Sequence, residues 1–175
     1  GFMTTGVVVL HFGDPADTRA CLRSVAASRV AAAPLVVVDN GTRAITAADV
    51  AAEAPGAVFV ALPVNLGFAG GCNVGIRRVM AAGADGVVLL NNDAQIEPDC
   101  IGELQRLAAG PTVAAVGAKV LSAADPSRLW AAWGHLTWRA ALVEMVGRGE
   151  RDGPPFDTPR DVESVPATVV LLTRG

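Results

Sequence analysis

The feature that most restricts the fold is a series of short apolar runs, each ending at polar or turn-forming residues. Four of them are Val7–Leu10, Leu35–Val38, Ala57–Leu62 and Val87–Leu90. Continuous apolar runs of this length are typical of strands that are buried on both faces of a parallel sheet. Segments with helical spacing separate these runs, so strand and helix alternate along the chain. That alternation predicts a doubly wound α/β fold with a parallel sheet.

Helix-starting signals fill the connections between the runs. Asp14 or Asp17 can cap a first helix, and Thr46 with Asp49 three residues later is close to a capping box. We expect four helices, which begin near Asp14, at Thr46, at Val74 and at Pro98.

The pattern changes in the last third of the chain. Residues 113–121 predict a fifth strand, and residues 129–146 hold all three tryptophans without clear periodicity. For 129–146 we expect a twisted antiparallel hairpin or a lid. Residues 147–160 are rich in Gly, Pro and Asp, which predicts a loop, and a last strand is expected over 165–172.

Bulk properties exclude several classes of protein. The 175 residues match one domain, and no apolar run approaches the roughly 18–20 residues of a membrane span. The net charge of −3, without a basic block, argues against a nucleic-acid partner. Cys21, Cys72 and Cys100 lack metal-ligand spacing and predict free buried thiols in a reducing compartment. We expect a cytoplasmic protein, and peripheral association with the inner face of the membrane is left open.

The fourth run ends on Asn91-Asn92-Asp93. In open α/β sheets, ligands bind just beyond the carboxyl ends of the strands. A carboxylate with neighbouring amides suits Mg²⁺ or Mn²⁺, which keep several waters and share substrate phosphates. Asp93 is therefore a candidate metal ligand. The alternative is that the three residues only form a turn before a helix, because Asn and Asp favour turns.

The first and second runs end at the same edge of such a sheet. His11-Phe12-Gly13 and Asp39-Asn40 should therefore lie near Asp93. The carboxylate of Asp39 can accept hydrogen bonds from a base or a ribose hydroxyl. As an alternative, Asp39 is a turn-former in Asp-Asn-Gly.

Several glycines follow the third run, at positions 67, 70, 71 and 75. At a loop-to-helix junction, glycines let the backbone approach a diphosphate and direct N–H groups toward it. Their spacing fits neither the dinucleotide-binding fingerprint nor the P-loop. The alternative is that Gly70 and Gly71 permit close packing of a helix on the sheet.

Three motifs occur in order: Asp39-Asn40, Asn65-Leu66-Gly67-Phe68-Ala69-Gly70-Gly71-Cys72-Asn73 and Leu89-Leu90-Asn91-Asn92-Asp93. With them, the stretch from Val7 to Leu121 resembles the family 2 nucleotide-sugar glycosyltransferases, above all rhamnosyltransferase-like and related bacterial polysaccharide or natural-product transferases. The resemblance implies the GT-A fold, a Rossmann-like α/β sandwich with a mostly parallel central sheet and a C-terminal antiparallel or mixed extension. We expect a single domain over 1–175, with a nucleotide-sugar-binding half over 4–121 and a partial acceptor-side half over 122–175.

The resemblance also implies roles for individual residues. His11 and Phe12 would line the nucleobase pocket, Asp39 would bind base or ribose, and Asp93 would bind Mg²⁺ or Mn²⁺ at the last position of the family's Asp-x-Asp-type motif. Asn91 stands at the first position, which leaves strict metal dependence open. The implied donor-binding residues are His11, Phe12, Asp39, Asn65, Gly67, Gly70, Asn73, Asn91, Asn92 and Asp93.

The implied activity is transfer of a sugar from a nucleoside diphosphate to an acceptor hydroxyl, with inversion. The acceptor would be a glycan, a lipid-linked glycan or a small molecule, and a homodimer is left open. The family's acidic motif, which supplies the general base, follows a strand that here ends near Leu172, so we expect a truncated chain. Carboxylates that do not match that motif are Glu144, Asp152, Asp157, Asp161 and Glu163.

Two other functions stay open. The first is a non-catalytic nucleotide-sugar-binding module that is completed by a partner or by a missing C-terminal part. The second, a sugar nucleotidyltransferase, lacks the Gly- and Lys/Arg-rich signature expected directly after a first strand, where only Gly13 occurs.

Overall fold

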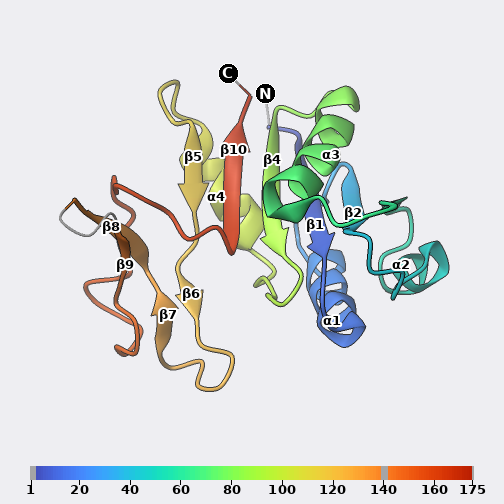
Figure 1. The fold of residues 1–175 in the computed structure, drawn as a ribbon. Helices are drawn as coiled ribbons and strands as arrows, with labels where there is room; N and C mark the ends of the chain where they lie inside the picture. Colours follow the sequence, from blue (N-terminus) through green and yellow to red (C-terminus); the bar gives the residue numbers. More distant parts are fainter. Residues whose placement is uncertain (1–2, 139–141, 175) are drawn as a thin grey trace.

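A computed structural model describes residues 3–138 and 142–174. Its largest element is a six-stranded sheet in the order β3-β2-β1-β4-β10-β5 (Figure 1). Four of these strands are parallel: β1 (Thr5–His11), β2 (Leu35–Asp39), β3 (Val58–Ala61) and β4 (Gly86–Asn91). The predicted mostly parallel α/β sheet is confirmed.

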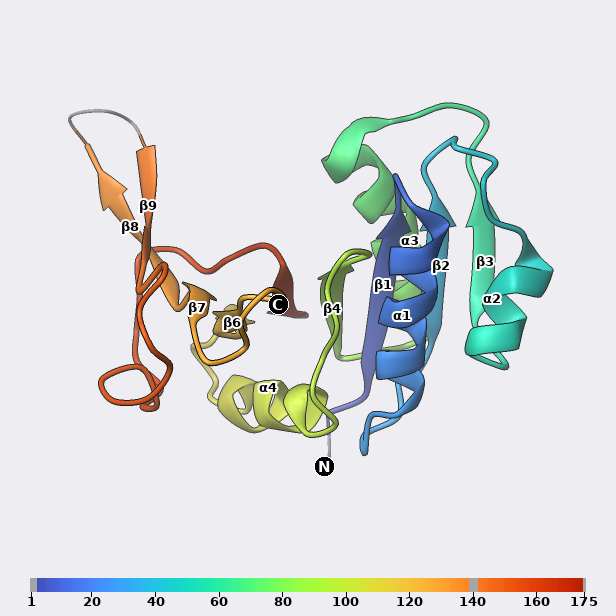
Figure 2. The ribbon, with the colours of Figure 1, turned by 90° about the horizontal axis from the view of Figure 1, so that it is seen from below.

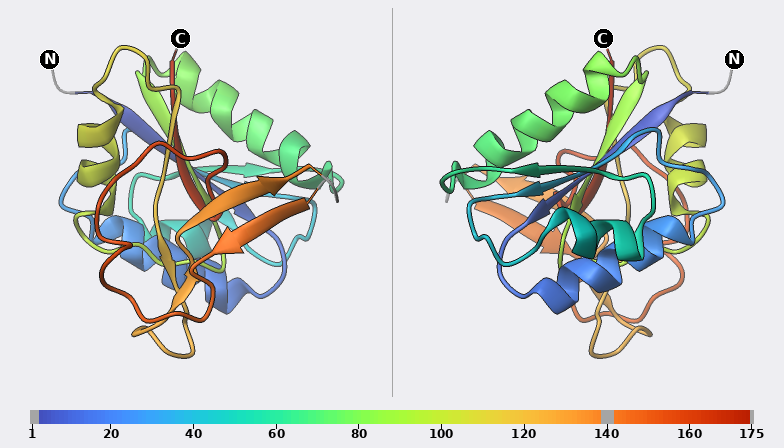
Figure 3. Two further views of the ribbon diagram at one scale, coloured as in Figure 1. Left: turned by 90° about the vertical axis from the view of Figure 1, so that its left-hand side faces the viewer. Right: turned by 90° about the vertical axis from the view of Figure 1, so that its right-hand side faces the viewer.

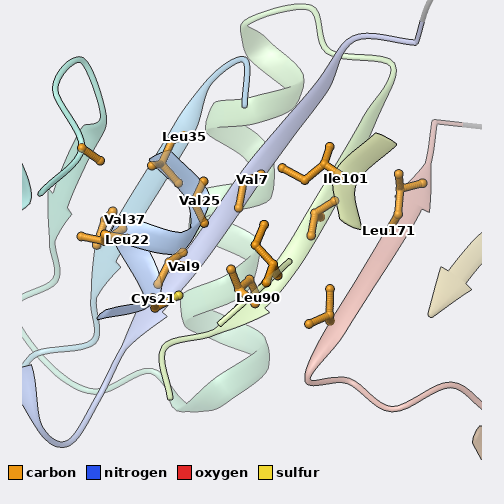
Figure 4. Close-up of a cluster of buried hydrophobic side chains, with 14 of the residues drawn as sticks. Val7, Val9, Cys21, Leu22, Val25, Leu35, Val37, Leu90, Ile101 and Leu171 are labelled. Carbon is orange, nitrogen blue, oxygen red and sulfur yellow. The ribbon is translucent and has the colours of Figure 1, made fainter. Parts of the chain in front are cut away.

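Helices cover both faces of this sheet (Figure 3). The helices α1 (Pro15–Ala26), α2 (Ala47–Glu53) and α4 (Cys100–Ala108) share one hydrophobic core, and α3 (Gly67–Ala81) forms a second core on the other face. Figure 4 shows part of the first core, where Val9 of β1 lies near Leu22 of α1. Alternate residues of β1, Val8 and Leu10, belong to the second core, as expected for a strand buried on both faces.

Local capping explains where two helices begin. Asp14, not Asp17, caps α1, because its Oδ1 accepts a hydrogen bond from the Ala16 N–H at 2.8 Å. At α2 the predicted capping box is present. The Asp49 N–H donates to Thr46 Oγ1 at 3.2 Å, and the Thr46 N–H donates to Asp49 Oδ2 at 2.9 Å.

Helix α3 begins at Gly67, seven residues before the predicted start at Val74. The predicted loop therefore ends at Leu66, and the glycines at 70, 71 and 75 lie inside the helix. A Cβ on Gly71 would lie 2.4 Å from Leu10 Cδ1, and one on Gly75 would lie 2.4 Å from Val8 Cγ1. Close packing of α3 on β1 is thus the physical reason for glycine at both positions, as the alternative interpretation of Gly71 proposed.

The predicted single strand over 113–121 is wrong. Two short strands replace it: β5 (Ala115–Gly117) joins the main sheet, whereas β6 (Val120–Leu121) pairs with β7 (Leu129–Ala131) in a separate sheet. Between them, Lys119 Nζ lies 2.6 Å from Asp152 Oδ1 and 2.8 Å from Asp157 Oδ1. These ion pairs hold the chain against the loop over 147–160 at the point where it leaves the main sheet.

The last strand, β10 (Val169–Thr173), is shorter than the predicted 165–172, and it lies between β4 and β5, antiparallel to both. Pro166 lacks the N–H that a central strand must donate, which explains the later start. For 129–146 a hairpin or a lid was expected, and the hairpin is confirmed for 133–146, where β8 (Trp133–Thr137) pairs antiparallel with β9 (Leu142–Val146). Residues 129–131 instead form β7, and residues 139–141 fall outside the described residues. In Figures 1 and 2 this hairpin lies on the β5 and β10 side of the sheet.

Within the described ranges, no helix has the length and apolar character needed to cross a membrane. The three cysteines are free thiols, as predicted: Cys21 and Cys72 are buried and Cys100 is half-buried. Burial raises the pKa of the Cys21 thiol to about 12 and that of Cys100 to about 11, and it also raises the pKa of Cys72.

Gly75→Ala tests the close contact between α3 and β1. Because the new Cβ would overlap Val8, we expect the free energy of unfolding in urea to fall by about 1–3 kcal/mol. The control is Gly102→Ala in α4, where the nearest atom, Val30 Cγ2, would lie 3.3 Å from the added Cβ. We expect a change below about 1 kcal/mol there, since alanine favours the helix. Equal effects at both positions would contradict the packing argument.

Thiol reactivity tests the burial of the cysteines. The thiolate is the reactive form, and a pKa raised above the ordinary value of about 8.5 lowers the thiolate fraction at pH 8. We therefore expect slow labelling of the native protein by a maleimide at pH 8 and labelling of all three thiols after unfolding. The native reactivity of Cys100 and Cys21 should rise only as the pH approaches their raised pKa values, about 11 and 12. Rapid labelling of the folded protein at pH 8 would contradict the described burial.

Candidate donor-binding site

The carboxyl ends of β1, β2 and β4 lie at one edge of the sheet. In the strand register, His11 is opposite Asp39, and Leu10 is opposite Asn91. The arrowheads of β1 and β4 mark this edge at the lower side of the sheet in Figure 1. The predicted convergence of the three strand ends is therefore present.

A hydrogen-bonded junction links two of these strand ends to α1. The Asn92 side-chain amide donates to the Phe12 carbonyl and to Thr18 Oγ1, both at 2.9 Å. Thr18 Oγ1 also lies 2.6 Å from His11 Nδ1. Sequence reasoning missed Thr18. The sequence does hold a hint of its role. Thr18 is a polar residue that lies three residues before Cys21 and four before Leu22, and so on the buried face of α1.

His11 is fully buried, and its Nε2 has no hydrogen-bond partner among the described residues. Burial lowers the pKa of His11, and the nearby negative charge of Asp39 only partly opposes this effect. His11 is therefore a neutral side chain at neutral pH. Phe12, in contrast, is 59% exposed.

Asp39 is buried, and its carboxylate is engaged locally. Oδ1 accepts hydrogen bonds from the Thr42 N–H at 3.0 Å and the Thr42 hydroxyl at 2.6 Å, and Oδ2 accepts one from the Arg43 N–H at 2.8 Å. This is the turn-forming arrangement that the Asp-Asn-Gly sequence favours.

Asn40 holds the start of α3 against the end of β2, and sequence reasoning gave it no such role. Its Oδ1 accepts from the Leu66 N–H at 3.0 Å, and its Nδ2 donates to the Gly67 carbonyl at 3.2 Å. Gly41 lies close to this loop, because a Cβ there would be 2.5 Å from the Val64 carbonyl carbon. The N-terminus of α3 is thus fixed to the edge of the sheet that carries the site.

Side chains already satisfy part of the N-terminus of α3. Besides the Leu66 N–H bound by Asn40, the Gly67 N–H donates to Asn65 Oδ1 at 2.7 Å. The N–H groups of Phe68 and Ala69 remain in the first turn, where the helix dipole favours an anion. Gly70 and Asn73 follow inside the helix, and Asn73 is exposed.

Asp93 lies in a turn directly after β4 and is exposed. The Ala94 N–H donates to the Asn91 carbonyl at 3.1 Å, which closes this turn. Within the described residues, no group of three or more His, Cys, Asp or Glu side chains forms a ready metal cage. One exposed carboxylate nevertheless fits Mg²⁺ or Mn²⁺, because these ions take most of their ligands from water and phosphate. The single carboxylate of Asp93 therefore fits a metal ion that takes its other ligands from water and from a bound diphosphate.

A family model described as glycosyl transferase family 2 matches residues 6–159. The chain belongs to this family. A comparison with curated protein sequences found no match.

Solved structures extend the comparison to the fold. A mannosyltransferase from Pyrobaculum calidifontis in complex with GDP-Man and Mn²⁺ is 21% identical, with a TM-score of 0.55 over 70% of this chain and 37% of that chain. TarS 1–349 from S. aureus is 17% identical, with a TM-score of 0.55 over 67% and 36%. Glucosyl-3-phosphoglycerate synthase from Mycobacterium tuberculosis, in complex with Mn²⁺, UDP and glucosyl-3-phosphoglycerate, is 22% identical, with a TM-score of 0.51 over 66% and 43%.

These similarities establish the GT-A fold, as the sequence predicted. The match covers 36–43% of the length of the three solved proteins. Family and fold together indicate a glycosyl transferase family 2 domain with the GT-A fold.

Asn40→Ala tests the attachment of α3. Removing two buried hydrogen bonds should lower the free energy of unfolding by about 1–3 kcal/mol and speed amide hydrogen exchange over residues 64–69. The control is Asn65→Ala, which removes a single bond at an exposed residue and should have the smaller effect on both measurements. Unchanged exchange over 64–69 in Asn40→Ala would contradict the role given to Asn40.

Proposed function

We propose that this chain binds a nucleoside-diphosphate sugar and transfers the sugar, with inversion and divalent-metal assistance, to an acceptor hydroxyl. The observation that carries the proposal is the pairing of two features at one edge of the sheet. Asn40 fixes the N-terminus of α3 to the end of β2, and the end of β4 carries the exposed carboxylate of Asp93. The positive N-terminal end of a helix suits the phosphate groups of a diphosphate–metal complex, and a carboxylate suits its metal ion.

The base and ribose would bind between the ends of β1 and β2. Phe12 offers an exposed ring, and His11 and Asp39 lie opposite one another in the register. Because the Asp39 carboxylate already accepts three hydrogen bonds, binding base or ribose would use its remaining acceptor capacity or rearrange the turn over 39–43.

The diphosphate would bind at the first turn of α3. The N–H groups of Phe68 and Ala69 would donate to phosphate oxygens, while Asn65, Gly67 and Asn73 would border the ribose and diphosphate. In this proposal glycine at position 70 leaves room for Leu66, the residue directly before α3, since a Cβ at position 70 would lie 2.8 Å from Leu66 Cβ.

Asp93 would hold the metal, with Asn91 and Asn92 shaping the turn around it. When bound, Mg²⁺ or Mn²⁺ would neutralise the charge that develops on the leaving diphosphate. Two of the similar structures contain Mn²⁺ together with GDP-Man or UDP, which supports a donor of this class.

The acceptor side is proposed for residues 122–175, and the donor side for residues 4–121. The acceptor would be a glycan, a lipid-linked glycan or a small molecule that carries a free hydroxyl. Three of the later carboxylates are already paired. Asp152 and Asp157 bind Lys119, and Glu163 Oε2 lies 2.7 Å from His135 Nδ1.

The engagement of these three carboxylates favours one alternative, a nucleotide-sugar-binding module whose general base comes from elsewhere. General-base catalysis contributes about 10²–10⁴-fold to a rate. The module would therefore bind donor yet transfer the sugar slowly.

Thermal unfolding in the presence of UDP, TDP, GDP or NAD, each with and without Mn²⁺, tests donor binding. A ligand at about 100 times its Kd adds roughly 2.7 kcal/mol of stability, and each kcal/mol raises the Tm by about 2–4 °C at this chain length. We expect a rise of roughly 5–11 °C with one nucleoside diphosphate and Mn²⁺.

Two variants show whether Asp93 supplies the metal site. Asp93→Asn keeps the side-chain shape and should abolish the Mn²⁺-dependent part of the rise. Asp85→Asn, beside the other end of β4, should keep the full rise, even though its own Tm changes because a neutral amide oxygen replaces the charged acceptor of the Thr4 N–H. A folded wild-type protein whose Tm responds to none of the four nucleotides would refute the donor-binding function.

A further inference from the structure

We infer that Thr18 is a positioning residue of the donor site: its hydroxyl joins His11 to Asn92 and so holds the turn that carries Asp93. The inference rests on the proposed function, because it concerns how that site is kept in shape. Thr18 contributes through Asn92 and not by contact with donor or metal.

The junction brings together three segments that are distant in sequence. Thr18 belongs to α1, His11 to β1, and Asn92 to the turn after β4, 74 residues from Thr18. Thr18 is 1% exposed and His11 is fully buried, so the contact between them is shielded from water, whereas Asn92 is half-buried. A buried polar group that loses its partner costs about 1–3 kcal/mol, which makes the junction a strong constraint on geometry.

Counting hydrogens assigns a direction to each bond. The Asn92 amide nitrogen carries two hydrogens, and one goes to the Phe12 carbonyl while the other goes to Thr18 Oγ1. Thr18 Oγ1 therefore accepts from Asn92, and we assign its own hydrogen to His11 Nδ1 at 2.6 Å, because the hydrogen bonds of the described residues give this hydroxyl no other acceptor. His11 is then the tautomer with its proton on Nε2, the buried atom without a described partner.

These hydrogen bonds matter for the site because Asp93 directly follows Asn92 in the chain. Both amide hydrogens of Asn92 are engaged, and the preceding residue is held through its backbone. The Asn91 N–H donates to the Thr168 carbonyl at 3.0 Å, and the Asn91 carbonyl accepts from the Ala94 N–H at 3.1 Å. The turn is thus fixed by α1, β1 and the segment before β10, and Asp93 is presented from a rigid support.

The test compares Thr18→Val, which keeps the shape but removes the hydroxyl, with Thr18→Ser, which keeps the hydroxyl. A matched control is Thr5→Val at the other end of β1. Thr5 is also 1% exposed, and its Oγ1 also accepts from a side-chain amide, that of Gln105, at 2.9 Å. Both valine variants remove the same kind of bond, but only Thr18→Val removes one that leads to Asp93.

Calorimetric titration with UDP and with GDP, each in the presence of Mn²⁺, measures the effect. We expect about a 10-fold loss of affinity in Thr18→Val, as for other residues that support a metal ligand. Thr18→Ser and Thr5→Val should stay within about twofold of the wild type, although Thr5→Val loses stability on urea unfolding. Unchanged affinity in Thr18→Val, or an equal loss in Thr5→Val, would overturn the inference.

A second measurement does not need a ligand. In the ¹⁵N spectrum of the His11 imidazole, the wild type and Thr18→Ser should show the Nε2–H tautomer, and a wild-type spectrum of the Nδ1–H form would overturn the hydrogen-bond assignment. If wild-type protein binds neither nucleotide, the proposed function fails and this inference with it. If wild-type protein binds and Thr18→Val binds equally well, only the role of Thr18 fails.

Discussion

The close approach of α3 to β1 is the contact on which the edge of the sheet depends. Gly71 and Gly75 bring the helix so near that a single added carbon would overlap Leu10 or Val8. The same approach places Gly71 beside Asn40, whose Oδ1 would lie 3.3 Å from a Cβ at that position. Asn40 can then bind the Leu66 N–H and the Gly67 carbonyl, so the packing of the core also sets the position of the helix N-terminus. Core and candidate site therefore share one geometric requirement.

Local signals predicted those parts of the fold that local chemistry determines. The buried runs gave β1, β2 and β4, and side-chain caps gave the starts of α1 and α2. The early turns of α3 were missed because glycine is a poor helix former, and tertiary packing outweighed that preference. The break between β5 and β6 was also missed. Lys119, which lies between them, pairs with carboxylates 33 and 38 residues away, and no local pattern reports such partners.

The candidate site was likewise predicted in part and missed in part. Its location followed from the rule that ligands bind at the carboxyl ends of parallel strands, and His11, Asp39 and Asp93 do end the expected strands or follow them directly. The supporting residues could not be found this way. Thr18 acts on a residue 74 positions away, and Asn40 acts on residues 26 and 27 positions away. A buried polar residue on a helix stripe was the available hint for Thr18, but its partner depends on how the whole sheet is assembled.

The position of β10 has a consequence for the order of folding. This strand fills the sheet between β4 and β5, yet it is synthesised 78 residues after β4 ends. Until it arrives, one side of β4 has no strand to pair with, and its backbone N–H and C=O groups are open to other chains. Strand β5 has no partner in the main sheet at that stage either, because it pairs only with β10. The nascent chain therefore passes through a stage with an unpaired apolar edge, where chaperone binding and aggregation compete with completion of the sheet.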